Sequence, residues 1–158
     1  MYGLIPLGIF HLAVSLVALG TGAFLLLRDK EITSSSLAGR IYIFATIVTC
    51  ATALGIYQHG RFGNAHVLAI LTLIVLGLAV LAGNSGVFGA KSRIVAAVAY
   101  SATFLFHLIP AFAEAFTRLP LGSPLAGSAE DPLVKIAHGI LLLLFLIGAV
   151  RQVKLLQR

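Results

Sequence analysis

Five apolar runs, separated by short polar stretches, account for most of the chain. They cover about residues 4–27, 37–57, 65–82, 94–116 and 133–150. Each run comes close to the ~20 consecutive apolar residues that an α-helix needs to cross the hydrocarbon core of a bilayer. The pattern therefore predicts an all-α fold, an integral membrane bundle of five transmembrane helices. Because 158 residues are too few for a second bundle, residues 1–158 are expected to form a single domain.

The polar stretches between the runs carry residues that start and end helices. Arg28–Glu31 closes the first run, and Ser34–Ser36 offers side-chain oxygens that can cap the start of the second. Glycine and asparagine predict a turn at Gln58–Asn64 and a break at Gly83–Gly86. Leu119–Pro132, rich in Pro, Gly and Ser, is expected to be a loop. The first run has no basic flank ahead of it, so it is interpreted as a retained span rather than a cleaved signal.

The composition agrees with a membrane protein and limits the classes of partner that are expected. The chain is 59% hydrophobic and only 10% charged, and its mean hydropathy is +1.06. The net charge of +6 would suit nucleic acid, but basic residues beside spans are better explained by the sidedness of membrane proteins. The expected partner is therefore the lipid bilayer and not nucleic acid. Cys50, the single cysteine, lies within a predicted span and is expected to be a small packing residue.

Lysine and arginine are divided unevenly between the two ends of the predicted bundle. Five spans place the termini on opposite sides, so each polar stretch can be assigned to one side. One side collects eight basic residues and the other three: Arg28, Lys30, Arg40, Lys91, Arg93, Arg151, Lys154 and Arg158 against Arg61, Arg118 and Lys135. The larger group is expected to face the cytoplasm. We therefore predict an N-terminus outside and a C-terminus in the cytoplasm, in the inner (plasma) membrane of a bacterium.

The histidines gather on the other, outer side. At a rise of ~1.5 Å per residue, His11 and His107 form a deep pair, roughly 12 and 15 Å below the outer boundary. His59 falls in the turn before the third run, on the same side. A shallow ring lies within roughly 3–8 Å of the boundary and consists of His66, His138 and Glu114.

The deep pair is the sharpest candidate for a cofactor site. Two histidines at similar depth on different helices can ligate the iron of a b-type haem axially, or share a smaller transition metal. The alternative is structural, because each imidazole can instead form a hydrogen bond with a neighbouring helix or a water molecule inside the bundle. Both interpretations of His11 and His107 stay open at the level of sequence.

The shallow ring offers a second kind of chemistry. Imidazole and carboxylate groups suit zinc or copper, and neutral imidazole can also relay protons, so His66, His138 and Glu114 form a candidate metal site. The alternative is a hydrated rim of polar side chains. Glu114 and Arg118 also stand four residues apart on one predicted helix, a spacing that favours an ion pair. Pro110 is expected to bend this helix below the ion pair, and a bend often borders a cavity. Glu114 and Arg118 therefore either line a substrate or quinone pocket or end the helix at the membrane interface.

Several short motifs together resemble a known family. They are Leu37-Ala-Gly-Arg-Ile-Tyr42, Thr52-Ala-Leu-Gly-Ile-Tyr57, Gly60-Arg-Phe-Gly63 ahead of His66, and Pro110-Ala-Phe-Ala-Glu114-Ala-Phe-Thr-Arg118-Leu-Pro120. On these motifs the chain resembles the small bacterial inner-membrane proteins of domain-of-unknown-function family 2306. The resemblance implies the same fold and location, and no particular activity. Family members often carry a histidine just ahead of the Gly-Arg-x-Tyr element and another opening the fourth span, where this chain has Ser35 or Ser36 and the 91–93 region.

These observations lead to three functional hypotheses. The first is a small polytopic membrane protein with an outer polar site of histidines, which binds haem or a metal in a redox role. The second is an accessory or scaffold subunit of a larger membrane complex, without chemistry of its own. The third, a small transporter, is disfavoured because the inner half has no ionisable residues between the helix ends. Oligomers are expected to associate through small residues such as Gly20, Gly22 and Gly77.

Overall fold

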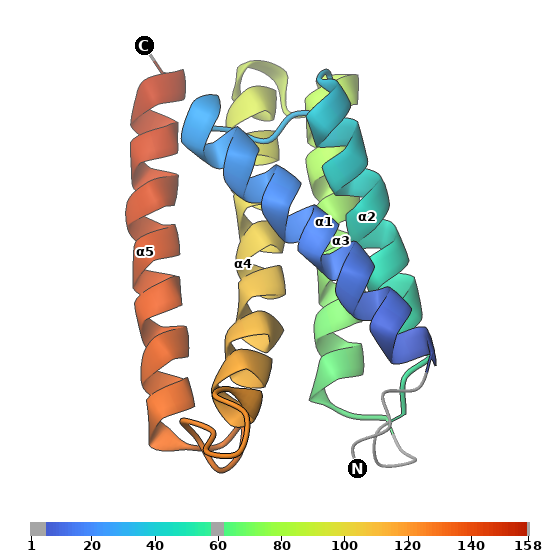
Figure 1. The fold of residues 1–158 in the computed structure, drawn as a ribbon. Helices are drawn as coiled ribbons and strands as arrows, with labels where there is room; N and C mark the ends of the chain where they lie inside the picture. Colours follow the sequence, from blue (N-terminus) through green and yellow to red (C-terminus); the bar gives the residue numbers. More distant parts are fainter. Residues whose placement is uncertain (1–5, 58–61, 158) are drawn as a thin grey trace.

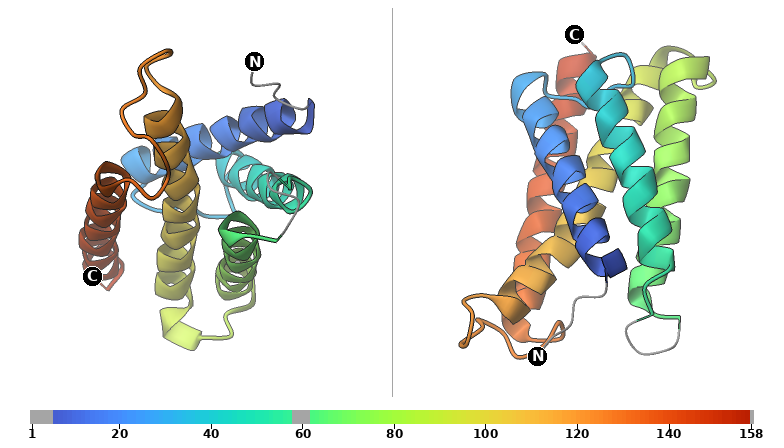
Figure 2. Two further views of the ribbon diagram at one scale, coloured as in Figure 1. Left: turned by 90° about the horizontal axis from the view of Figure 1, so that it is seen from below. Right: turned by 45° about the vertical axis from the view of Figure 1, so that its right-hand side comes forward.

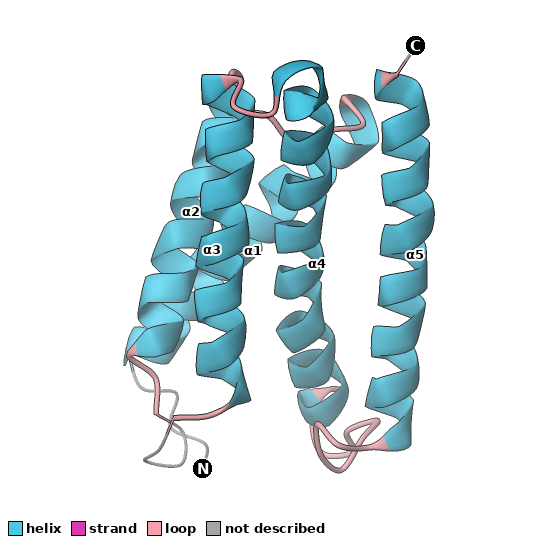
Figure 3. Cartoon of the chain, turned by 180° about the vertical axis from the view of Figure 1, so that it is seen from behind, coloured by secondary structure: helices cyan, strands magenta, loops and turns pink. Residues whose placement is uncertain are grey.

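The computed structural model describes residues 6–57 and 62–157 and is an all-helical bundle (Figure 1). The helices are α1 (Pro6–Arg28), α2 (Leu37–Leu54), α3 (Asn64–Ser85), α4 (Ser92–Arg118) and α5 (Pro132–Leu156), with a short 3₁₀ helix, η1 (Gly89–Lys91), before α4. The described residues contain no strand (Figure 3). All five α-helices are long and apolar enough to cross a membrane. The predicted five-span, all-α fold is thereby confirmed.

The helix ends follow local chemistry, with some differences from the sequence-based boundaries. The Ser36 hydroxyl accepts a hydrogen bond from the Gly39 backbone N–H at 3.0 Å and caps α2, as expected. The break predicted at Gly83–Gly86 falls at the end of that stretch, because α3 continues to Ser85 and ends at Gly86, whose φ of 63° glycine adopts readily. α5 extends beyond the predicted residue 150 to Leu156, since its last turns still consist of good helix formers. Residues 58–61 of the predicted turn, including His59, lie outside the described residues.

α4 is the central helix of the bundle, and α5 is the peripheral one. α1 crosses the bundle obliquely and packs on α2 and α4, while α3 packs between α2 and α4 (Figure 2). α5 contacts no helix except α4 in the described part of the chain. No Cα atom of α2 comes within 8 Å of one in α4. The space between α2 and α4 is therefore bridged by side chains rather than by close backbone packing.

Small residues set how closely the other helices approach one another. A Cβ atom at Gly22 of α1 would stand 2.7 Å from Cδ2 of Phe104 and 2.8 Å from Cε2 of Tyr42. Only glycine allows α1 to lie against both rings at this point. Gly20 and Gly77 have open space where a Cβ atom would be. Gly22 therefore serves packing within the chain rather than association between chains.

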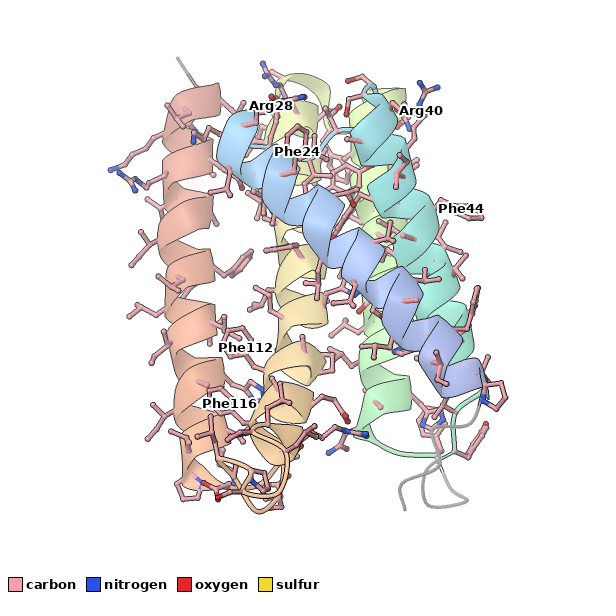
Figure 4. The ribbon with its side chains drawn as sticks, in the orientation of Figure 1. Phe24, Arg28, Arg40, Phe44, Phe112 and Phe116 are labelled. Atoms are coloured by element: carbon pink, nitrogen blue, oxygen red, sulfur yellow. The ribbon has the colours of Figure 1, made fainter. Side chains whose placement is uncertain are left out.

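The two ends of the bundle differ in charge, and we call the end that holds the C-terminus the basic end. Figure 4 shows Arg28 and Arg40 there. The helix directions gather the described basic residues of the larger predicted group at this end: Arg28, Lys30, Arg40, Lys91, Arg93, Arg151 and Lys154. Two of them form ion pairs, Arg28 with Asp29 at 2.7 Å and Arg93 with Glu31 at 2.6 Å. The guanidinium of Arg28 holds the pKa of the Asp29 carboxyl below its usual value by hydrogen bonding to it.

Candidate functional site

Hydroxyl groups line the inner face of α2. Tyr42, Thr46, Thr49 and Thr52 follow one another at intervals of three or four residues, so their side chains share one side of the helix. Tyr42 and Thr46 are fully buried, and Thr49 is nearly so. Each of the four lies within 3.5 Å of a polar side chain on α1 or α4. We call this set the polar column, and it consists of His11, Ser15, Tyr42, Thr46, Thr49, Thr52, Thr103 and His107.

His11 on α1 is held by α2 at the end of the column away from the basic end. Its Nδ1 atom lies 2.9 Å from Oγ1 of Thr52. The Thr52 hydroxyl already donates its proton to the carbonyl of Val48 at 2.8 Å, so its oxygen accepts from His11 Nδ1–H. In the neutral imidazole, Nε2 of His11 is consequently left with a free lone pair. This atom is the candidate base of the column, and the His11 side chain as a whole is partly buried.

His107 on α4 lies deeper in the bundle. Its side chain is 7% exposed, and its Nε2 atom lies 3.1 Å from Oγ1 of Thr46. The Tyr42 ring meets the His107 ring edge-on, with the centroids 6.3 Å apart. The imidazole therefore joins α4 to α2 across the space where their backbones do not meet.

The end of the polar column nearest the basic end is formed by a hydrogen bond between Tyr42 and Thr103. Thr103 donates to the carbonyl of Tyr100 at 2.7 Å, so its oxygen accepts from the Tyr42 hydroxyl at 2.8 Å. On the other side of His107, the Ser15 hydroxyl donates to the carbonyl of His11 at 2.7 Å and lies 3.5 Å from Thr49 Oγ1. The hydroxyl protons of Thr103 and Ser15 thus end on backbone carbonyls. This satisfies buried polar groups that would otherwise be costly in a membrane.

His11 and His107 are engaged by two different hydroxyl groups of α2. Their threonine partners are six residues apart on α2, which is ~9 Å along the helix axis. The ring nitrogen that Thr46 leaves to His107 is Nδ1, the nitrogen next to Cγ. The structure brings both histidines into one column, and each is joined to α2 rather than to the other.

The three residues of the shallow ring, His66, His138 and Glu114, lie on three different helices and do not meet. The His66 ring stacks with Phe62 at 4.9 Å and with Tyr57 at 4.6 Å between centroids, and its Nδ1 accepts from the Gly63 N–H at 3.1 Å. His66 therefore caps the start of α3 inside an aromatic pair. Its predicted partners, His138 and Glu114, lie on α5 and α4.

His138 and Glu114 each have another partner nearby. Nε2 of His138 donates to the carbonyl of Ile109 at 2.9 Å and joins α5 to α4 beside Pro110. Glu114 forms the predicted ion pair with Arg118, and α4 continues through Pro110. Across residues 6–57 and 62–157, no three His, Cys, Asp or Glu side chains are arranged to hold a metal. The expected metal site of His66, His138 and Glu114 is thus not assembled, because each side chain is engaged on its own helix or with a different neighbour.

Sequence reasoning identified the histidines but not the hydroxyl groups that bind them. Thr46, Thr49 and Thr52 are weakly polar and blend into an apolar run. Their spacing of three residues was the available signal, because it places all three on one side of a helix. Gln152, at the other end of the bundle, was also missed, although a buried glutamine in a span is rare enough to indicate a specific partner.

Comparisons with known proteins found no protein similar to this chain. Neither the protein-family models nor the curated proteins nor the solved structures contain a match to the chain. The resemblance to family 2306 stays an expectation that rests on the motifs quoted above. What is established is therefore the architecture, a bundle of five helices that can each span a membrane.

Proposed function

We propose that this chain is a multi-pass protein of the bacterial inner membrane, with its basic end in the cytoplasm, and that it binds protons at the polar column. His11 is the group that exchanges the proton. One observation carries the proposal: Nδ1 of His11 lies 2.9 Å from Oγ1 of Thr52, whose proton is donated to Val48, and from this we infer that Nδ1 carries the proton of His11 and Nε2 is left as a base. Imidazole is the side chain whose protonation changes most readily near neutral pH.

The surroundings of His11 support access from the end opposite the basic end. The side chain is partly buried and lies in the first half of α1, close to that end. Glu114 of α4 lies toward the same end of the bundle. Glu114 and its partner Arg118 are both about half exposed. A proton that enters from this end therefore crosses only the outer part of the bundle to reach the imidazole, and not its whole depth.

The column supports proton binding better than proton conduction. A proton wire needs hydroxyl groups that can each pass a proton onward, but the protons of Thr52 and Thr103 are donated to backbone carbonyls. His107 is deeply buried beyond Thr49, and the column holds no further imidazole, carboxylate or amine between it and the basic end. The small-transporter hypothesis therefore remains the weakest of the three.

A redox role through haem is not part of this proposal, since Thr52 and Thr46 already engage a ring nitrogen of each histidine. The accessory-subunit hypothesis is kept as the second candidate, because α5 contacts only α4 and exposes long apolar side chains along much of its length. Such a helix can pack against another subunit of a membrane complex. Substituting His11, His107 and Glu114 together separates the two candidates: an accessory subunit keeps its partner binding and phenotype, whereas a proton-binding protein loses its activity.

Nitrogen NMR of the full chain in lipid nanodiscs tests the proton-binding site directly. With ¹⁵N-labelled histidine, the His11 signals are assigned by their loss in His11→Gln. We expect Nδ1 to carry the proton at high pH and Nε2 to gain one as the pH falls through the range about 9 to 5. His138→Gln is the matched control and should leave these signals unchanged. A His11 ring that carries its proton on Nε2 at high pH, or that never titrates, would contradict the proposal.

A further inference from the structure

A cavity of about 760 Å³ lies between α4 and α5 at the basic end of the bundle, beside the last turn of α1. It is separate from the polar column, since none of its lining residues belongs to that set. Apolar side chains form its walls, among them Leu105 and Leu108 of α4 and Leu144 and Phe145 of α5. We call it the α4–α5 groove.

Hydrogen bonds join α5 to the rest of the bundle near both of its ends. At the basic end, Gln152 donates from Nε2 to the carbonyl of Lys30 at 2.7 Å and accepts at Oε1 from the Ser101 hydroxyl at 3.0 Å. Near the opposite end, His138 holds α5 to the carbonyl of Ile109. Between them, Gly148 contributes no side chain, and a Cβ atom there would meet nothing within 4 Å. An apolar space is left open beside the Gln152 hydrogen bonds.

Positive charge surrounds the mouth of this space. Lys30, Arg151 and Lys154 all line the groove. Arg151 and Lys154 form no ion pair with any described residue, unlike Arg28 and Arg93 at the same end. Lys30 donates from Nζ to the carbonyl of Leu27 at 2.6 Å. The groove therefore combines an apolar interior with a cationic rim, at the level where a span leaves the hydrocarbon.

We propose that the α4–α5 groove binds one anionic phospholipid. An acyl chain lies along the apolar walls, and the phosphate of the headgroup contacts Arg151 and Lys154. Basic pockets between transmembrane helices suit anionic headgroups, because the charge of the lipid is neutralised while its chain stays in apolar surroundings. A second copy of this chain suits the groove less well, since two cationic rims would face each other across the contact.

Native mass spectrometry of the delipidated full chain can measure this binding. The protein is titrated with phosphatidylglycerol or with phosphatidylcholine of the same acyl chains. We expect the wild type to bind phosphatidylglycerol more tightly than phosphatidylcholine. The double variant Arg151→Gln/Lys154→Gln should weaken its binding by about 25-fold, since each basic residue near an anionic lipid contributes about fivefold. Binding of phosphatidylcholine should stay unchanged.

A charge-matched variant distinguishes the groove from a general attraction of the basic end. Arg40→Gln/Lys91→Gln removes the same charge from the same end, and neither residue lines the groove. It should change the affinity for phosphatidylglycerol by less than about twofold. An equal loss in both double variants, or equal binding of the two lipids to the wild type, would overturn the proposal.

The apolar part of the groove is tested by filling it. Gly148→Leu places a side chain in the groove, and Gly139→Leu adds the same side chain elsewhere on α5, where space is also open. Gly148→Leu should reduce the binding of both lipids at least about fivefold, while Gly139→Leu should leave it unchanged. Both variants are first compared with the wild type by circular dichroism and size-exclusion chromatography. If Gly148→Leu instead dissociates a dimer and leaves lipid binding intact, the occupant is a second copy and the proposal is wrong.

Discussion

Tyr42 on α2 donates its hydroxyl proton to Thr103 on α4 over 2.8 Å, although the Cα atoms of the two helices stay more than 8 Å apart. A long side chain is needed to cover this distance, and Tyr42 is fully buried while it does so. The same space is crossed again by His107 and Thr46, one turn away. Polar side chains thus join these two helices where backbone packing does not.

We expect a measurable but modest coupling between Tyr42 and Thr103. Tyr42→Phe and Thr103→Val each remove one partner of the hydrogen bond, and each should lower the free energy of unfolding by about 1 kcal/mol. In a double-mutant cycle, the interaction energy should be about 0.6 kcal/mol, a common value for hydrogen bonds between transmembrane helices. Unfolding in mixed micelles with increasing dodecyl sulfate provides the measurement. Strict additivity would show that the two hydroxyls do not interact.

Gly22 should tolerate no side chain, in contrast to Gly20 on the same helix. A methyl group at Gly22 would collide with Phe104 and Tyr42, so Gly22→Ala should destabilise the protein by about 1–3 kcal/mol through overpacking. Gly20→Ala meets open space and should be neutral or slightly stabilising, because alanine favours a helix. Thermal unfolding of the two variants in the same detergent compares them. Equal effects would mean that α1 does not pack on α4 and α2 at this position.

Gln152 should determine how firmly α5 is held. Gln152→Leu removes the hydrogen bonds to Lys30 and Ser101 and leaves their polar atoms unpaired, at a cost of about 1–3 kcal/mol. Amide hydrogen exchange should accelerate in the second half of α5, while α2 and α3 remain protected. Gln157→Leu is the control, since that side chain is exposed at the end of the helix. Unchanged exchange in α5 would contradict this role.

The uneven distribution of basic residues predicts the orientation in the membrane. A reporter that is active only in the cytoplasm should work at the C-terminus and fail at the N-terminus, and a periplasmic reporter should show the reverse. Substituting Arg151 and Lys154 with glutamine should weaken this preference without reversing it, because other basic residues remain at the same end. A cytoplasmic N-terminus would be incompatible with the proposed access of protons to His11 from outside.

The geometry around His11 and His107 also predicts a spectrum. The purified protein, after growth with added haem precursor, should show no Soret absorption. Substituting both histidines with glutamine should leave the spectrum unchanged, since each imidazole is bound to a threonine of α2. A Soret band that disappears in this double variant would instead support axial ligation of haem by these histidines.

Much of the candidate site was visible in the sequence as a set of unusual residues. Histidines are rare inside membrane spans, so His11 and His107 are noticeable against their apolar runs. The threonines that bind these histidines are not noticeable in the sequence, because threonine occurs often in spans for packing reasons alone. The shallow ring shows the opposite error: His66, His138 and Glu114 share a depth, but each has a partner of its own.

The number of spans, the separation of basic residues from histidines, and the cap at Ser36 could all be predicted from the sequence. These properties depend on residues that are close together in the chain, where hydropathy and helix geometry apply directly. Which faces of the helices meet is known only from the folded structure. Four of the five helices are apolar on nearly every side, so no local pattern shows which side points inward. The pairing of His11 with Thr52, and the groove beside α5, follow from helix rotation and crossing, which depend on close packing at residues such as Gly22.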